Sequence, residues 1–165
     1  MTRPFLPLCL LLLLFVLNGC GGVPKPEDFP DVVAPVTVKV HRDGSPLRGV
    51  TVILHSKEAA ASFLVTGETE ASGVATIVTS RNTYTKAGAP KGKYLVQLTE
   101  VFNVDMPTLS MDATPEQEAA WQKEYNEKAD KVRSFPKALS RVASSPLEID
   151  ITSAPVAVEF DVTKY

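Results

Sequence analysis

Few side chains in this sequence are of the types that do chemistry, and they are scattered. His41 and His55 lie on or just beyond two predicted strands, where they could face each other across a hairpin as metal ligands would. Two histidines without cysteines or grouped carboxylates are too few for a structural zinc site. We therefore expect surface or edge histidines and predict no metal and no cofactor.

Charged side chains offer two weaker candidates. The densest acidic stretch has oxygens that would suit calcium, and it contains Asp105, Asp112, Glu116 and Glu118. No Asp-x-Asp-x-Asp loop accompanies it, so the sequence does not predict a calcium site. A group of lysines on one predicted turn contains Lys86, Lys91 and Lys93. We expect a solvated rim there, with contact to an anionic surface as the alternative.

Catalytic motifs and a basic excess are both missing from the sequence. It has no nucleophile elbow, HExxH, P-loop or GxGxxG motif, so we predict that the protein is not an enzyme. The 165 residues include 17 Lys+Arg and 19 Asp+Glu, a net charge of −2, which argues against nucleic acid as a partner. The content of hydrophobic residues, 44%, is typical of one globular domain.

The remaining reactive side chains are two cysteines, Cys9 inside an apolar segment and Cys20 at its end. Residues 5–17 form a run of 13 mostly apolar residues behind Arg3. This length fits the core of a signal peptide, which is 7–15 residues. It falls short of the roughly 20 residues that a helix needs to span a bilayer. The run ends in the tetrapeptide Leu-Asn-Gly-Cys at 17–20.

This ending resembles bacterial lipoproteins, whose signal peptidase cuts before a cysteine that follows a small residue, with Leu three places back. The resemblance implies a lipoprotein signal peptide over residues 1–19 and an acylated Cys20, with membrane lipid as a partner. It places the protein in the cell envelope, at the outer membrane or cell surface rather than the inner membrane. The alternative is an ordinary secretory signal that happens to end near a cysteine.

Residues 20–35 read as a linker between this anchor and a domain. Gly21 and Gly22 are followed by four prolines, which favour extended chain. At about 3.1 Å per residue, such a segment could hold a domain up to roughly 40 Å from the membrane. A terminus without a spacing role is the alternative.

From residue 36 onward, apolar and polar residues alternate with period two, which predicts half-buried strands. Seven strands are expected, at 36–40, 50–54, 63–66, 73–79, 93–99, 147–151 and 156–162. Seven short strands with turns between most of them are typical of a β-sandwich. The predicted core consists of Val36, Val38, Val40, Val52, Leu54, Leu95, Leu147, Ile149, Ile151, Val158, Phe160 and Val162.

One insertion, residues 113–135, breaks the alternation. Thr114 as N-cap, Pro115 at the first helical position and Gln117 predict a helix start, and the helix is expected over about 115–133. Trp121, Tyr125 and Val132 share one narrow face. We expect the helix to cross over and pack on its own sandwich. The alternatives are a helix that offers Trp121 and Tyr125 to a partner, or a frayed one.

Four short motifs are similar to those of carboxypeptidase-regulatory-like, transthyretin-like domains. They are DGSPLRGVTV at 43–52, GETEASGVA at 67–75, GAPKGKYLV at 88–96 and SSPLEI at 144–149. The resemblance implies an all-β fold, a single seven-stranded immunoglobulin- or transthyretin-like β-sandwich over residues 36–165 with one helical insertion. It implies no activity, because such modules accompany enzymes without doing their chemistry.

Together these features predict a membrane-anchored, extracytoplasmic lipoprotein that acts as a structural or binding module. The expected partner is a cell-envelope protein or a polysaccharide. The alternative is an accessory subunit of a polysaccharide- or peptide-processing or transport system.

Overall fold

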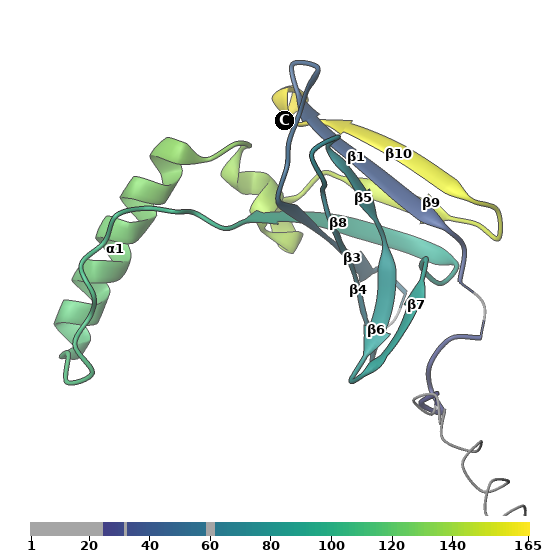
Figure 1. Ribbon diagram of the computed structural model, residues 1–165, viewed down its shortest axis with the longest axis horizontal. Helices are drawn as coiled ribbons and strands as arrows, with labels where there is room; N and C mark the ends of the chain where they lie inside the picture. Colours follow the sequence, from purple (N-terminus) through teal and green to yellow (C-terminus); the bar gives the residue numbers. More distant parts are fainter. Residues whose placement is uncertain (1–24, 32, 59–61) are drawn as a thin grey trace, which may run out of the picture.

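Two β-sheets make up most of the protein. The computed structural model describes residues 25–31, 33–58 and 62–165, and the predicted signal peptide and Cys20 lie outside these ranges. Within them, ten strands form two sheets, accompanied by one α-helix and three short 3₁₀ helices (Figure 1). The expectation of an all-β fold with one helical insertion is therefore confirmed.

The smaller sheet is built around the first strand. Its members are β1 (Val36–Arg42), β2 (Ser45–Pro46), β5 (Val74–Thr76) and β10 (Val156–Asp161). β10 lies parallel to β1, with Val36 opposite Val156, whereas β2 and β5 pair with β1 in antiparallel fashion. The turn between β1 and β2 forms at Asp43 and Gly44, which both have positive φ, 49° and 79°. Two such residues in a row suit the tight turn of a hairpin.

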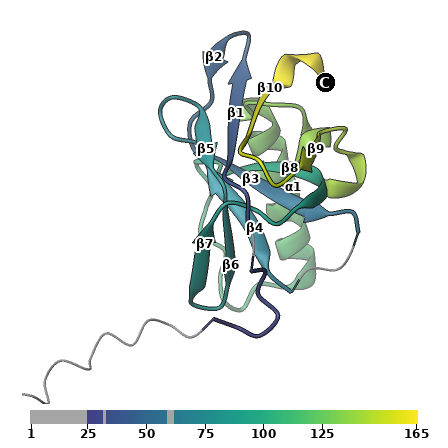
Figure 2. The ribbon, with the colours of Figure 1, turned by 90° about the vertical axis from the view of Figure 1, so that its right-hand side faces the viewer.

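The larger sheet has six strands, all paired antiparallel (Figure 2). In spatial order they are β7 (Tyr84–Ala87), β6 (Val78–Arg81), β4 (Leu64–Glu68), β3 (Val50–Ser56), β8 (Gly92–Glu100) and β9 (Glu148–Ile151). The 3₁₀ helices are η2 (Lys137–Ser140), η3 (Val142–Ser144) and η4 (Val162–Lys164).

The number of strands differs from the seven expected. The predicted strand 73–79 is two strands, because β5 pairs with β1 in one sheet and β6 pairs with β4 in the other. β2 has only two residues, and β7 is too short and polar to show an alternating pattern. Sheet membership depends on distant partners, which local alternation does not reveal.

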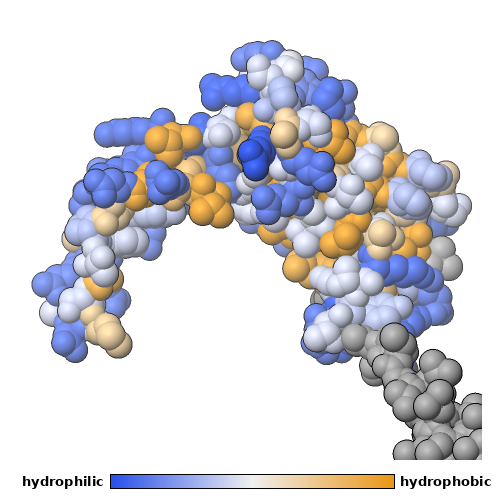
Figure 3. All heavy atoms as spheres, in the orientation of Figure 1, coloured by the Kyte–Doolittle hydropathy of each residue, from blue (hydrophilic) through white to orange (hydrophobic). Residues whose placement is uncertain are grey.

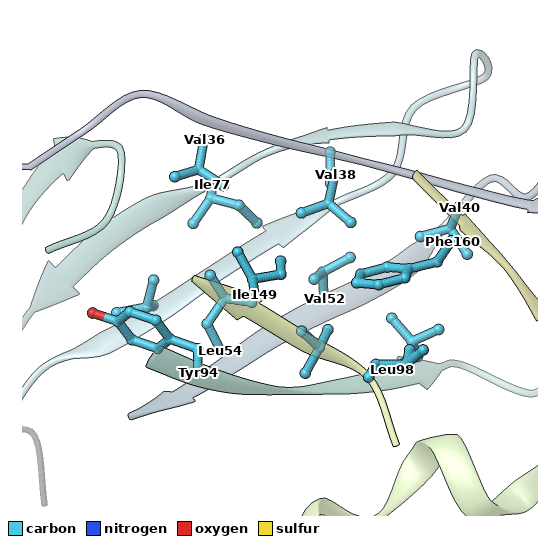
Figure 4. Close-up of a cluster of buried hydrophobic side chains, with 14 of the residues drawn as sticks. Val36, Val38, Val40, Val52, Leu54, Ile77, Tyr94, Leu98, Ile149 and Phe160 are labelled. Carbon is cyan, nitrogen blue, oxygen red and sulfur yellow. The ribbon is translucent and has the colours of Figure 1, made fainter. Parts of the chain in front are cut away.

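The core lies between the two sheets. Figure 4 shows side chains of β1 pointing toward Val52 and Leu54 of β3, with Phe160 of β10 beside them. Ten of the twelve predicted core residues are buried. Val158 is only half-buried against the core. The prediction that Leu95 belongs to the core is wrong, since its side chain lies on the outer face of β8. β8 turns its other face inward, the one that carries Tyr94, Val96 and Leu98.

Tyr94 combines an apolar and a polar role. Its ring is buried, and its hydroxyl donates a hydrogen bond of 2.9 Å to the carbonyl of Pro90. Burial, and to a smaller extent the charge of Glu58, raises the pKa of the Tyr94 phenol. The bond fastens the start of β8 to the loop before it.

The predicted linker is partly folded onto the sandwich. Phe29 is only 3% exposed, and its ring meets that of Tyr84 edge-on, with 4.6 Å between the ring centres. Ala34 is buried and exchanges two backbone hydrogen bonds with Ala89. Residues 25–31 and 33–35 therefore differ from the extended spacer that the prolines suggested, because one aromatic side chain among them finds an apolar site.

Candidate functional site

An arm projects from the sandwich between β8 and η2. It consists of residues 101–134: an irregular segment, 101–114, which we call the strap, followed by α1 (Pro115–Val132) and the two residues after it. Figure 3 shows the arm curving away from the sandwich, which gives the molecule an arched outline with a hollow beneath. The arm is the most distinctive surface of the described structure, and we treat it as the candidate site.

The helix begins where the sequence predicts. The Thr114 side chain accepts from the Gln117 backbone N–H, and the Gln117 side chain accepts from the Thr114 N–H at 2.8 Å, a reciprocal capping box. The helix ends at Val132, one residue before the expected end. Only Ala129 of α1 is buried, so little of its surface is covered.

The strap, rather than either sheet, covers one face of α1. Along the strap, Phe102, Val104 and Met106 are half-buried while the residues between them are exposed. The Trp121 indole N–H donates to the Pro107 carbonyl at 2.7 Å, and the Lys128 ammonium donates to the Asp105 carbonyl at 2.7 Å. The expectation that the helix packs on its own sandwich differs from this arrangement, since its partner is the segment that precedes it.

The two predicted partner-contact residues form a stacked pair. The rings of Trp121 and Tyr125 are 5.5 Å apart and nearly parallel, at 7°. Both side chains are half-buried. Their spacing of four residues places them one above the other on the helix surface. The pair therefore stiffens the arm and still leaves part of both rings accessible.

Charged groups fix the arm at its base. The Arg133 guanidinium lies over the ring of Phe102, 4.7 Å from its centre, and pairs with Asp130 at 2.9 Å. Hydrogen bonds from Arg133 and Lys137 hold the pKa of Asp130 below its ordinary value. The Glu100 carboxylate accepts from the Ser134 backbone N–H at 3.0 Å. The contact of Arg133 with Phe102 joins the two ends of the arm to each other, and the Glu100–Ser134 bond ties them to β8.

Large apolar side chains are exposed along the arm. Val101 is 94% exposed, and Met111 is fully exposed at the tip. Leu109 beside it and Val132 at the base are also exposed. Four of the six large hydrophobic residues classed as exposed in the described structure lie on this arm. Exposed apolar side chains that gather on one element are typical of an interaction surface.

Three clefts border these residues, and two of them lie at the base and the tip of the arm. One, of about 470 Å³, lies where the base of the arm meets β3 and β4, and Arg48, Glu68, Glu100 and Val132 are among its lining residues. The other, of about 340 Å³, lies at the tip between strap and helix, against Leu109 and Trp121. Both are open grooves, which suit the side chains of a partner.

The other candidate residues are not brought together. His41 lies in β1, 3.0 Å from the Glu159 carboxylate, whereas His55 lies in β3 of the other sheet and contacts Gln97 at 2.8 Å. Among the residues that the structure describes, no group of three or more His, Cys, Asp or Glu side chains could hold a metal ion.

The acidic stretch and the lysine group singled out in the sequence each contain a residue that forms a local hydrogen bond. Glu116 lies in the first turn of α1, where backbone and Thr114 hydrogen bonds lower the pKa of its carboxyl. Lys86 donates to the Asp31 carbonyl at 2.6 Å and so holds the linker.

Two features, one in the arm and one in the linker, were not predicted from the sequence. The strap carries apolar residues at every second position, Phe102, Val104 and Met106, a signal that could have predicted a packed segment. Phe29 is a lone large aromatic residue among prolines, which could have indicated an attachment point. The prolines around Phe29 favoured an extended linker, so its burial was not predicted.

Comparisons of the chain with protein-family models, with curated proteins and with solved structures find no match. The resemblance to carboxypeptidase-regulatory-like domains therefore stays a prediction. In the described part of the chain, the helices are too short or too polar to traverse a bilayer.

Proposed function

We propose that the protein is a lipid-anchored, extracytoplasmic binding module in which the sandwich carries the arm to a partner in the cell envelope. The arm is the observation that carries this proposal: it projects from the sandwich, and Val101, Leu109, Met111 and Val132 expose apolar surface along it. The apolar run that ends at Cys20 supports the anchor. The glycine turns at Gly44 and Gly73, both with positive φ, support a transthyretin-like sandwich.

The partner surface combines the tip with the aromatic pair. Leu109 and Trp121 line the tip cleft, so a side chain of the partner could enter there and reach the indole. Partly exposed aromatic residues are common anchors of protein interfaces. Glu124 is among the residues that line this cleft, and Asp112, Glu116 and Glu118 are next in the chain to two others, Ala113 and Gln117. This negative charge favours a protein surface with basic residues over an acidic polysaccharide.

Cys20→Ser is expected to move the protein from the membrane fraction to the soluble fraction. Each buried acyl CH₂ contributes roughly 0.8 kcal/mol, so loss of several chains removes nearly all membrane affinity. Cell fractionation with immunodetection measures the change. Cys9→Ser is the matched control, since it lies inside the predicted signal peptide and should leave the anchor intact. An intact mass that corresponds to an unmodified mature chain beginning elsewhere would overturn the anchor.

A photo-crosslinking amino acid at position 111 is expected to capture a partner in intact cells. The control is the same amino acid at Thr152, which is exposed on the sandwich. Leu109→Ser in the first protein should reduce the product about tenfold, since apolar contacts at the centre of an interface contribute roughly 1–2 kcal/mol. Products of equal yield from positions 111 and 152 would exclude the arm as the binding surface.

A further inference from the structure

The described part of the linker is fastened to one end of the sandwich. We call residues 25–31 the docked segment. Beyond the Phe29–Tyr84 contact, the ring of Phe29 lies 6.4 Å from that of Phe63, between centres. Asp28 forms an ion pair with Arg81, and Lys25 forms one with Asp31. Together with the bond from Lys86, these contacts place the docked segment at the end where β6 turns into β7.

The docked segment shortens the distance to the proposed anchor. Only four residues lie between Cys20 and Lys25. A chain spans at most about 3.6 Å per residue, so Lys25 lies within about 18 Å of the Cys20 backbone. The extended linker expected from the sequence allows more than twice that distance. This step rests on the proposed acylation of Cys20.

The two ends of the sandwich are well separated. The turn between β6 and β7 lies at the linker end, and the turn between β1 and β2 lies at the opposite end near the C-terminus (Figure 1). The seven residues of β1 alone span about 23 Å between them. The tip of the arm, where α1 begins, points toward the linker end in both views (Figures 1 and 2).

We propose that the docked segment sets the orientation of the protein on the membrane, with the β6–β7 end against the lipid headgroups and the β1–β2 turn away from them. The hollow of the arch then opens toward the bilayer. Asp28 and Asp31 pair with Arg81 and Lys25 at this end, and the exposed carboxylate of Glu27 offsets the ammonium of Lys86. This surface therefore brings little net charge to the headgroups. A flexible linker would leave every orientation open, whereas a segment held through Phe29 keeps the β6–β7 end close to the anchor.

Energy transfer to the membrane tests this orientation. Single cysteines at Thr83, in the β6–β7 turn, and at Ser45, in β2, each receive a donor dye in the full-length lipidated protein. Both positions are exposed. The protein is reconstituted into vesicles of phosphatidylethanolamine and phosphatidylglycerol that carry an acceptor on the headgroup. We expect transfer from position 83 to exceed transfer from position 45 several-fold.

Phe29→Ala is expected to reduce this difference to near unity, because it removes the buried contact of the docked segment. Phe29 lies outside the main core cluster, so the sandwich should remain folded, as circular dichroism will check. Glu27→Ala, an exposed change in the same segment, is the matched control and should leave the difference intact. Equal transfer from both positions in the wild type, or an unchanged difference in Phe29→Ala, overturns the orientation alone. A chain that does not remain with the vesicles overturns the anchor and, with it, the orientation.

Discussion

Val38→Asp is expected to unfold the protein at temperatures at which the wild type remains folded. Val38 is fully buried in β1, between the two sheets, and Figure 4 shows it facing Val52. Its surroundings are apolar, so an aspartate there would be a buried carboxylate without a partner. Such a change costs several kcal/mol, on the order of 4, which is comparable to the whole stability of many domains. Thermal and urea unfolding followed by circular dichroism measure the loss.

Thr37→Asp is the control for that substitution. Thr37 is the neighbour of Val38 in the same strand, but it is half-buried on the opposite face, beside Lys39. The same new charge should therefore change stability by no more than about 1 kcal/mol. If the two variants melt together with the wild type, the central place of β1 in the core is wrong.

Leu139→Ala is expected to destabilise the protein by about 3 kcal/mol and to loosen the arm. Leu139 belongs to η2, directly after the arm, and it is fully buried in the same core cluster as Val96. Loss of a buried leucine costs roughly 2–5 kcal/mol, since transfer energy and a cavity add. Urea unfolding measures the stability. The rate of proteolysis within 101–114, which should rise, measures how firmly the arm is held.

Val142→Ala in η3 separates the two effects. Val142 is half-buried, so its truncation should cost less than about 1 kcal/mol and leave cleavage of the strap unchanged. If cleavage of the strap is as slow in Leu139→Ala as in the wild type, the arm is held by the contacts of Arg133 and Glu100 alone.

The sequence predicts strands well where alternation has a single interpretation. In β1, valines alternate with Thr37 and Lys39, so the inward face is unambiguous. In β8, three of the four apolar side chains, Tyr94, Val96 and Leu98, lie on one face, and that face is the buried one. Leu95 is alone on the other face, so the alternation of β8 does indicate the correct side, and the prediction of Leu95 as a core residue went against it. Alternation does not reveal which strands share a sheet: β5 and β6 read as one strand but pair in different sheets.

One part of the candidate site could be predicted from the sequence, and another part could not. The start of α1 was predicted because a capping box joins residues three apart, Thr114 and Gln117, and depends on nothing distant. The surface on which α1 packs was not predicted, since an amphipathic helix can cover a sheet or a strap equally well. The bond from Trp121 to Pro107 joins residues 14 positions apart, across the end of the strap and the first turns of α1, and no periodicity in the sequence indicates it. Phe29 reaches Tyr84 across an even longer stretch.

The parallel pairing of β1 with β10 has a consequence for how the chain folds. The ion pair between Lys39 and Glu159 joins positions 120 residues apart, and β1 lies between β10 and the antiparallel strands of the smaller sheet. Contacts of such long sequence separation slow folding, because a large loop must close before they form. β1, the first strand to be synthesised, therefore cannot form this pairing until β10, the last strand, has been synthesised. Until β10 has been made, one edge of β1 has no partner, so the smaller sheet is completed only after the rest of the chain.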